Sequence, residues 1–208
     1  MVLFTLQDVK FLDIITYPGL EIAEGGATFL CGESGSGKST LLRLLNGTLS
    51  KAAGHIRYRD RDIEDCETIA LRREVLLAGQ SVYLFDKTIR ENFEEYYAYR
   101  DLEPPDEETI RAYLDLCLAP FPLDSMCNLL SGGERQRAFL AILLSLEPKV
   151  LMLDEPTSAL DDKTADGLME RILSHCREQK ITLIVVSHDK TLAARYADHT
   201  ITLEGGST

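Results

Sequence analysis

The chain has few cysteines, and none of them forms a C-x-x-C pair. There are five, scattered along 208 residues: Cys31, Cys66, Cys117, Cys127 and Cys176. An odd number without close spacing indicates neither a disulfide framework nor a zinc site, and it favours a reducing compartment. No apolar run approaches the ~20 residues that a membrane-spanning helix needs. Met1 leads into polar residues without a basic leader, so we expect no signal peptide and a cytoplasmic location.

Basic residues are also scarce. Lysine and arginine number 22 against 34 aspartates and glutamates, which gives a formal charge of −12. Nucleic-acid binding needs clustered lysine and arginine, so we expect no nucleic-acid partner. An acidic surface instead favours solubility. The hydrophobic share of 45% is ordinary for a globular protein, and the length is sufficient for one domain with a substantial core.

Apolar runs alternate with helix-like segments along the chain. The β-type runs are 27–30, 75–78, 150–153 and 181–186, and the helix-like segments are 39–46, 107–118, 134–146 and 163–179. The last run, "ITLIVV", is continuous and β-branched, as expected of a strand that is buried on both faces. Strands that alternate with helices predict an α/β fold with a mainly parallel sheet.

The middle third of the chain has a different pattern. Residues 86–146 contain no convincing strand but do contain the turn-rich stretches "EPPDEE" and "APFPLD". We interpret this part as a helical subdomain inserted into an α/β core formed by 1–85 and 147–208. The whole chain, 1–208, is then one domain.

A glycine-rich loop follows the first apolar run and precedes a helix-like segment. Its residues are Gly32, Glu33, Ser34, Gly35, Ser36, Gly37, Lys38 and Ser39, followed by Thr40. The pattern G-x-x-x-x-G-K-[ST] is typical of phosphate binding, because glycines allow consecutive N–H groups to face an anion and the helix start adds a positive dipole. Lys38 supplies a charge for the β- and γ-phosphates, and the Ser39 hydroxyl can ligate Mg²⁺. Alone, the loop indicates only a nucleotide: a kinase, a GTPase and a motor share it.

A second loop of small residues precedes another long helix-like segment. In "LSGGERQ" the residues Ser131, Gly132, Gly133 and Glu134 form a second anion-binding helix start. One nucleotide does not need two such starts on the same subunit. Two chains that meet head to tail do need them, because each then covers the phosphates held by the other.

With this stretch the chain resembles the ATP-binding cassette (ABC) ATPases, the motor subunits of ABC transporters, over nearly its whole length. "LSGGERQ" is the distinguishing signature of that family. The resemblance implies a P-loop NTPase core with a mainly parallel sheet, an antiparallel β edge and an inserted α-helical subdomain. It also implies ATP and Mg²⁺ as ligands, and a second ABC subunit, as a homodimer, as partner.

The resemblance assigns roles to residues at strand ends. "VLMLDE" ends in two carboxylates, which an apolar strand delivers to the sheet edge where ligands bind in open α/β folds. Asp154 resembles the residue that holds Mg²⁺, and Glu155 resembles the general base that polarises the attacking water. His188, in "VVSHD", resembles the switch histidine that contacts the γ-phosphate. The remaining histidines, His55, His175 and His199, are expected to be surface or core residues.

Two loops of the family and one aromatic contact complete the comparison. Gln80, in "AGQSVYLFDKTIRENF", resembles the glutamine-loop residue that touches Mg²⁺ or the water and senses the membrane partner. The stretch "SALD", which ends at Asp161, resembles the family's D-loop, which is expected to cross the dimer interface. The aromatic residue that stacks on adenine is best matched by Phe11, with Phe4 and Tyr17 as alternatives, either of which would serve equally as a core residue.

The chain contains a single cassette and no membrane segment, so a separate integral membrane permease is expected. Its contact would lie near Gln80 and the helical subdomain, around 81–92, with the protein peripheral on the inner face of the membrane. "FDKTIREN" and "LDEPTSALDD" resemble small bacterial cassettes, including those that serve iron-export-type permeases, although importers and lipoprotein-release cassettes share them. The alternatives are a soluble ABC ATPase that acts on nucleic acid or ribosomes, a regulatory cassette without turnover, and a P-loop kinase. The sequence shows neither the coiled coil nor the second cassette that the first alternative would need. The second alternative would not need the complete hydrolytic set, and the third leaves "LSGGERQ" unexplained.

Overall fold

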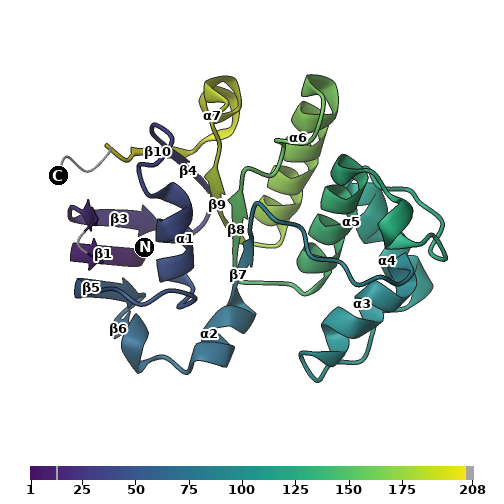
Figure 1. Cartoon of the computed structure of the whole chain (residues 1–208), viewed down its shortest axis with the longest axis horizontal. Helices are drawn as coiled ribbons and strands as arrows, with labels where there is room; N and C mark the ends of the chain where they lie inside the picture. Colours follow the sequence, from purple (N-terminus) through teal and green to yellow (C-terminus); the bar gives the residue numbers. More distant parts are fainter. Residues whose placement is uncertain (13, 205–208) are drawn as a thin grey trace.

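The computed structural model describes residues 1–12 and 14–204 of the chain. Five strands form a parallel sheet in the order β10-β4-β9-β8-β7 (Figure 1). They are β4 (Ala27–Cys31), β7 (Val75–Ala78), β8 (Val150–Asp154), β9 (Thr182–Val186) and β10 (His199–Thr202). Every residue of β8 and β9 is buried. Both strands are therefore central and covered on both faces, as predicted for the run 181–186 from its continuous hydrophobicity.

A second, antiparallel sheet lies beside the first. Its strands are β1 (Val2–Phe11), β2 (Ile15–Tyr17), β3 (Leu20–Ala23), β5 (Ala53–Tyr58) and β6 (Arg61–Asp62). The long strand β1 pairs with β2, β3 and β5, and β5 also pairs with β6. The fold class is confirmed, including the antiparallel edge that the family resemblance implied.

Helices cover the parallel sheet and extend beyond it on one side. They are α1 (Lys38–Leu45), α2 (Thr68–Glu74), α3 (Ile89–Ala98), α4 (Glu107–Leu116), α5 (Gly132–Ser145), α6 (Asp162–Glu178) and α7 (Lys190–Tyr196), with short 3-10 turns at Ile63–Asp65 and Cys127–Leu129. Helices α3, α4 and α5 lie together, in teal and green, away from the antiparallel sheet (Figure 1). The subdomain boundaries at 86 and 146 remain a prediction. Nowhere in 1–12 and 14–204 is a helix both long and apolar enough to span a bilayer.

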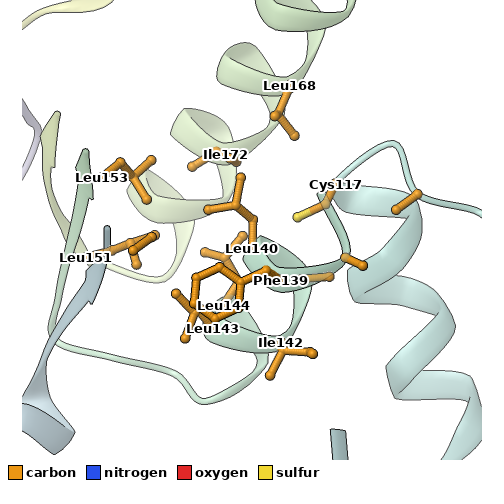
Figure 2. Packing of buried hydrophobic residues seen from close by; sticks show 14 of the residues in the cluster. Cys117, Phe139, Leu140, Ile142, Leu143, Leu144, Leu151, Leu153, Leu168 and Ile172 are labelled. Carbon is orange, nitrogen blue, oxygen red and sulfur yellow. The ribbon is translucent and has the colours of Figure 1, made fainter. Parts of the chain in front are cut away.

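The helical part is joined to the sheet through a shared core. Figure 2 shows apolar side chains of α5 between those of β8 and α6, with Leu140, Leu143 and Leu144 from α5, Leu151 and Leu153 from β8, and Leu168 and Ile172 from α6. Each of these residues is at most 4% exposed. Complete burial of one such side chain contributes about 1.5–3 kcal/mol relative to exposure. Helix α5 is thereby held against the strand that ends in the two carboxylates.

Candidate active site

A pocket of about 270 Å³ lies at the carboxyl ends of the parallel strands β4, β7, β8 and β9. It is lined by Ile15, Ser34, Gly35, Gly37, Lys38, Ser39, Thr40, Gln80, Glu155 and His188. The loop after β4 and the first turn of α1 supply six of these residues, β2 supplies Ile15, and the segments after β7, β8 and β9 supply the last three. The strands are parallel, so their carboxyl ends meet at one edge, and residues more than 100 positions apart in sequence share one pocket.

The glycine-rich loop has a backbone that only glycine adopts without strain. Gly32 has φ +142°, and a Cβ there would lie 2.3 Å from the carbonyl oxygen of Leu203. Gly37, the residue that precedes α1, has φ +91° and makes no side-chain cap to the helix. The first N–H groups of α1 therefore remain open toward the pocket, since they have no partner within the helix.

Lys38 is the basic residue of this loop and is only 5% exposed. Its Nζ donates hydrogen bonds to the carbonyl oxygens of Gly32, at 2.9 Å, and Glu33, at 2.6 Å, and lies 3.4 Å from Ser36 Oγ. The buried ammonium is thus satisfied by the loop itself. An anion that enters the pocket finds a positive charge already held at the loop, and backbone N–H groups beside it.

Two oxygen ligands meet beside Lys38. Ser39 Oγ donates to Asp154 Oδ1 at 3.0 Å, and Asp154 is 4% exposed at the end of β8. Hydroxyl and carboxylate oxygens are donors that Mg²⁺ prefers, so this pair fits the ion that accompanies a nucleotide. Among residues 1–12 and 14–204, no group of three or more His, Cys, Asp and Glu side chains is arranged to hold a metal ion.

Glu155 is turned toward the pocket by an unusual backbone. Its φ of +55° lies in the left-handed region, which costs a non-glycine residue of order 1–3 kcal/mol unless its surroundings hold it there. Its N–H donates to the carbonyl oxygen of Val186 at 2.9 Å, which ties it to the end of β9. His188 Nε2 lies 2.7 Å from Glu155 Oε1. The two side chains expected to act on the attacking water are therefore in direct contact.

The signature residues do not line this pocket. Ser131 is exposed at the start of α5, where its Oγ donates to Glu134 Oε2 at 2.7 Å and accepts from the Glu134 N–H at 3.4 Å. A Cβ on Gly133 would lie 2.8 Å from the carbonyl oxygen of Ala159, so this turn is packed on the loop that leads to Asp161. Asp161 caps the start of α6, where its Oδ1 accepts from the Thr164 N–H.

The structure places the three aromatic candidates differently. Phe4 is fully buried, and Tyr17 is 1% exposed with its hydroxyl on the carbonyl oxygen of Gly37, so both are core residues. Phe11 is partly buried against the core and is not among the residues that line the pocket. Its partner in the β1–β2 pairing, Ile15, does line the pocket. Nothing in the sequence distinguished Ile15, because the hairpin register alone brings it there.

A phosphate loop between a buried strand and a helix, with a serine–aspartate pair and a glutamate–histidine pair beside it, defines a P-loop nucleoside triphosphatase. The comparisons with known proteins narrow this class. The family model for ABC transporters matches residues 17–158. The nickel import ATP-binding protein NikO of Rhodobacter capsulatus is 38% identical over 98% of this chain and 86% of its own length. The probable iron export ATP-binding protein FetA of Escherichia coli is 33% identical over 97% and 91%.

A solved structure agrees with these relatives. A dimeric ATP-binding cassette in a post-hydrolysis state, bound to ADP and phosphate, superposes with a TM-score of 0.81 at 26% identity, over 98% of this chain and 97% of that one. The chain belongs to the ABC transporter family, as an ATP-binding subunit with ATPase activity.

Proposed function

We propose that two copies of the chain close head to tail on two ATP molecules, with Ser131 and Gly133 of each copy over the phosphate loop of the other. The observation that supports this most is the separation of the two motifs: the signature turn is exposed and absent from the pocket of its own chain. A C2 arrangement lets the same surface serve both copies. Asp161, beside the signature turn, would lie at the same interface.

Within each site the residues take separate roles. Lys38 and the N–H groups of 32–40 hold the β- and γ-phosphates, and Phe11 stacks on adenine. Glu155 accepts the proton of the attacking water, His188 positions that water and the γ-phosphate, and Gln80 connects the site to the partner. Positioning and charge stabilisation account for most of the rate increase in this reaction.

Mg²⁺ would be held by Ser39 and Asp154, with Gln80 nearby. The 3.0 Å contact between the Ser39 hydroxyl and Asp154 supports this, because it places two suitable oxygens at the pocket edge. A bound ion would supply positive charge that neutralises the phosphates. The chain contributes the orientation of these two ligands: Asp154 is fixed by a fully buried strand, and Ser39 by the first turn of α1.

The transporter's membrane component would dock near Gln80, on the segment 81–92 and the helical subdomain, with this chain on the inner face of the membrane. The segment offers an exposed ring, Tyr83, which is 62% exposed and packs edge-on against Phe85. Buried Asn92 braces it by accepting from the Phe85 N–H at 2.8 Å and donating to the Phe85 carbonyl at 3.2 Å. Such a braced surface loop with an exposed aromatic residue suits protein contact. An iron-export-type permease is one candidate partner, which the similarity to FetA supports.

Replacement of Glu155 by glutamine tests the site and the assembly together. Glu155→Gln removes the base but keeps the size of the side chain, so ATP should bind with wild-type affinity while hydrolysis falls by roughly 100-fold or more. The variant should accumulate as an ATP-bound dimer on size-exclusion chromatography. Glu103→Gln, an exposed glutamate outside the pocket, is the matched control. A Glu155→Gln variant that stays monomeric with millimolar MgATP and hydrolyses at the wild-type rate would overturn the proposal.

A further inference from the structure

Tyr17 connects the antiparallel sheet to the phosphate loop. It is the last residue of β2, it is 1% exposed, and its hydroxyl donates to the carbonyl oxygen of Gly37 at 2.7 Å. The same carbonyl accepts the first hydrogen bond of α1, from the Leu41 N–H at 2.8 Å. One peptide group, that between Gly37 and Lys38, is thus held from two directions.

The fit between β2 and this glycine is close. A Cβ on Gly37 would lie 2.7 Å from Tyr17 Oη and 3.1 Å from Ile15 Cδ1. Gly37 also has φ +91°, a conformation that other residues adopt only with strain. The glycine is required both by its backbone and by the two side chains of β2 that press against it.

The state of the Tyr17 hydroxyl is also defined. Its burial raises the pKa of Tyr17 far above the usual tyrosine range. The group is therefore a neutral donor at every pH at which the protein would be assayed. Tyr17 belongs to the buried cluster that includes residues of β1, β4 and α1, and the hydrogen bond to the Gly37 carbonyl fixes its hydroxyl.

The orientation of this peptide decides where its N–H points. A trans peptide is planar, and its C=O and N–H point in opposite directions. A carbonyl held on the Tyr17 side therefore directs the Lys38 N–H away from β2, to the open start of α1. The Lys38 N–H is one of the helix-start donors that have no partner within the helix and that bind phosphate.

We propose that Tyr17 is a positioning residue for nucleotide binding: it does not touch the nucleotide, but through the Gly37 carbonyl it orients the Lys38 N–H toward the phosphates. The inference rests on the proposed phosphate seat at Lys38. Without the hydroxyl the peptide keeps its bond from Leu41 but gains rotational freedom, so part of the orientation must be restored on each binding event. The effect should fall on affinity and not on the chemical step, because the hydroxyl bonds to the loop that would hold the phosphates and not to Glu155 or His188.

The test is Tyr17→Phe, which removes one oxygen and leaves the ring in the core. The matched control is Tyr58→Phe, in the same sheet, whose buried ring also donates its hydroxyl, to Glu74 Oε2 at 3.0 Å, but away from the loop. Loss of one hydrogen bond predicts that Tyr17→Phe raises Kd and KM for MgATP about fivefold. Its kcat should change less than about twofold, and Tyr58→Phe should keep the wild-type Kd. The amide resonance of Lys38 in the nucleotide-free protein should shift only in Tyr17→Phe.

Two outcomes contradict the proposal. One is a Tyr17→Phe protein with wild-type Kd and KM, and the other is an equal rise in Kd in both tyrosine variants, which would indicate a general loss of stability. Lys38→Ala is measured in parallel to distinguish failure of the positioning role of Tyr17 from failure of the phosphate seat itself. If Lys38→Ala loses nucleotide binding while Tyr17→Phe does not weaken it, only the positioning role fails. If Lys38→Ala binds as tightly as the wild type, the phosphate seat itself fails.

Discussion

Two helices of this protein begin at turns of glycine and serine, and their N-termini are capped differently. Helix α1 begins after Gly37, which is left-handed and offers no side-chain cap. Helix α5 begins after Ser131, whose hydroxyl and N–H are both bonded to Glu134 in a capping box. Both ends carry the positive end of a helix dipole and unpaired N–H groups. The start of α1 has no side-chain cap, whereas at the start of α5 a carboxylate is bonded to the capping serine.

The difference shows that two helix starts of similar sequence can differ in how they would receive a phosphate. The hydrogen bonds from the Ser131 hydroxyl and N–H lower the pKa of Glu134, so it is ionised at neutral pH. A phosphate that approaches α1 meets the ammonium of Lys38, whereas one that approaches α5 also meets an anion. The α1 end therefore suits binding by a single chain, and the α5 end suits a second contact that forms only after the nucleotide is held.

The largest effect should come from a substitution at the start of α1. Lys38→Ala removes the charge that the loop holds, and affinity for ATP should fall roughly 100-fold, because hydrogen bonds from charged groups to phosphate are the strong ones. Equilibrium binding of a fluorescent ATP analogue measures it. Lys10→Ala, an exposed lysine on β1, is the control and should bind normally. Unchanged affinity in Lys38→Ala would remove the basis of the comparison.

A substitution at the start of α5 should have a different effect. Ser131→Ala should leave ATP binding to the single chain unchanged but reduce ATP-driven dimerisation and hydrolysis by about tenfold or more. It should also cost about 1 kcal/mol of stability through the lost cap.

Asp106→Ala separates the two effects of that substitution. Asp106 caps α4 by accepting from the Thr109 N–H at 2.8 Å, far from both motifs in sequence. Its loss should reduce the free energy of unfolding by a similar amount, measured by denaturant titration, without affecting hydrolysis. Equal losses of hydrolysis in both variants would mean that Ser131 acts only through helix stability.

The smallest effect should come from the charge of Glu134. Glu134→Gln keeps the capping-box hydrogen bonds but removes an anion near the incoming phosphate. Association of two ATP-bound chains should strengthen about threefold at low salt and less at high salt, because exposed charges are screened. Analytical ultracentrifugation in the Glu155→Gln background gives the dimer constant. Weaker association in Glu134→Gln would indicate that the carboxylate assists the contact.

The same variant has a defined pH dependence. Glu134 has a lowered pKa in the folded state, so the stability it contributes is present above its unfolded value of 4.5 and is lost as pH falls through the lower folded pKa. The difference in unfolding free energy between wild type and Glu134→Gln should therefore change below about pH 4.5 and stay constant between pH 6 and 8. Urea titrations at several pH values measure it.

Strands with strong local signals were predictable from sequence. The runs that became β8 and β9 are continuous, apolar and buried at every residue, so their class did not depend on context. The antiparallel sheet was not located strand by strand. Its strands β2 and β6 have three and two residues and exist only because they pair with β1 and β5. Segments this short carry no usable periodicity.

Helix α3 was also missed, although its start carries a recognisable signal. Thr88 and Glu91 form a capping box, the threonine–x–x–glutamate pattern that marks a helix N-terminus. The helix that follows contains three aromatic residues, which have modest helix propensity, and its apolar positions are interrupted by charged side chains. Packing of Ile89 and Phe93 into the core stabilises it. The capping box is therefore the clearest sequence signal for the start of this helix.

The sequence alone supplied the residues of the proposed site: the phosphate loop, the pair Asp154 and Glu155, His188 and the turn at Ser131 are short local patterns, and their separate roles are predictions from the family resemblance. Tertiary structure decided which of them meet. The register of β1 and β2 put Ile15 and Tyr17 on the phosphate loop, and the left-handed backbone of Glu155 brought its carboxylate to His188. Contacts between residues far apart in sequence depend on strand pairing and burial, which no short stretch of the chain encodes by itself.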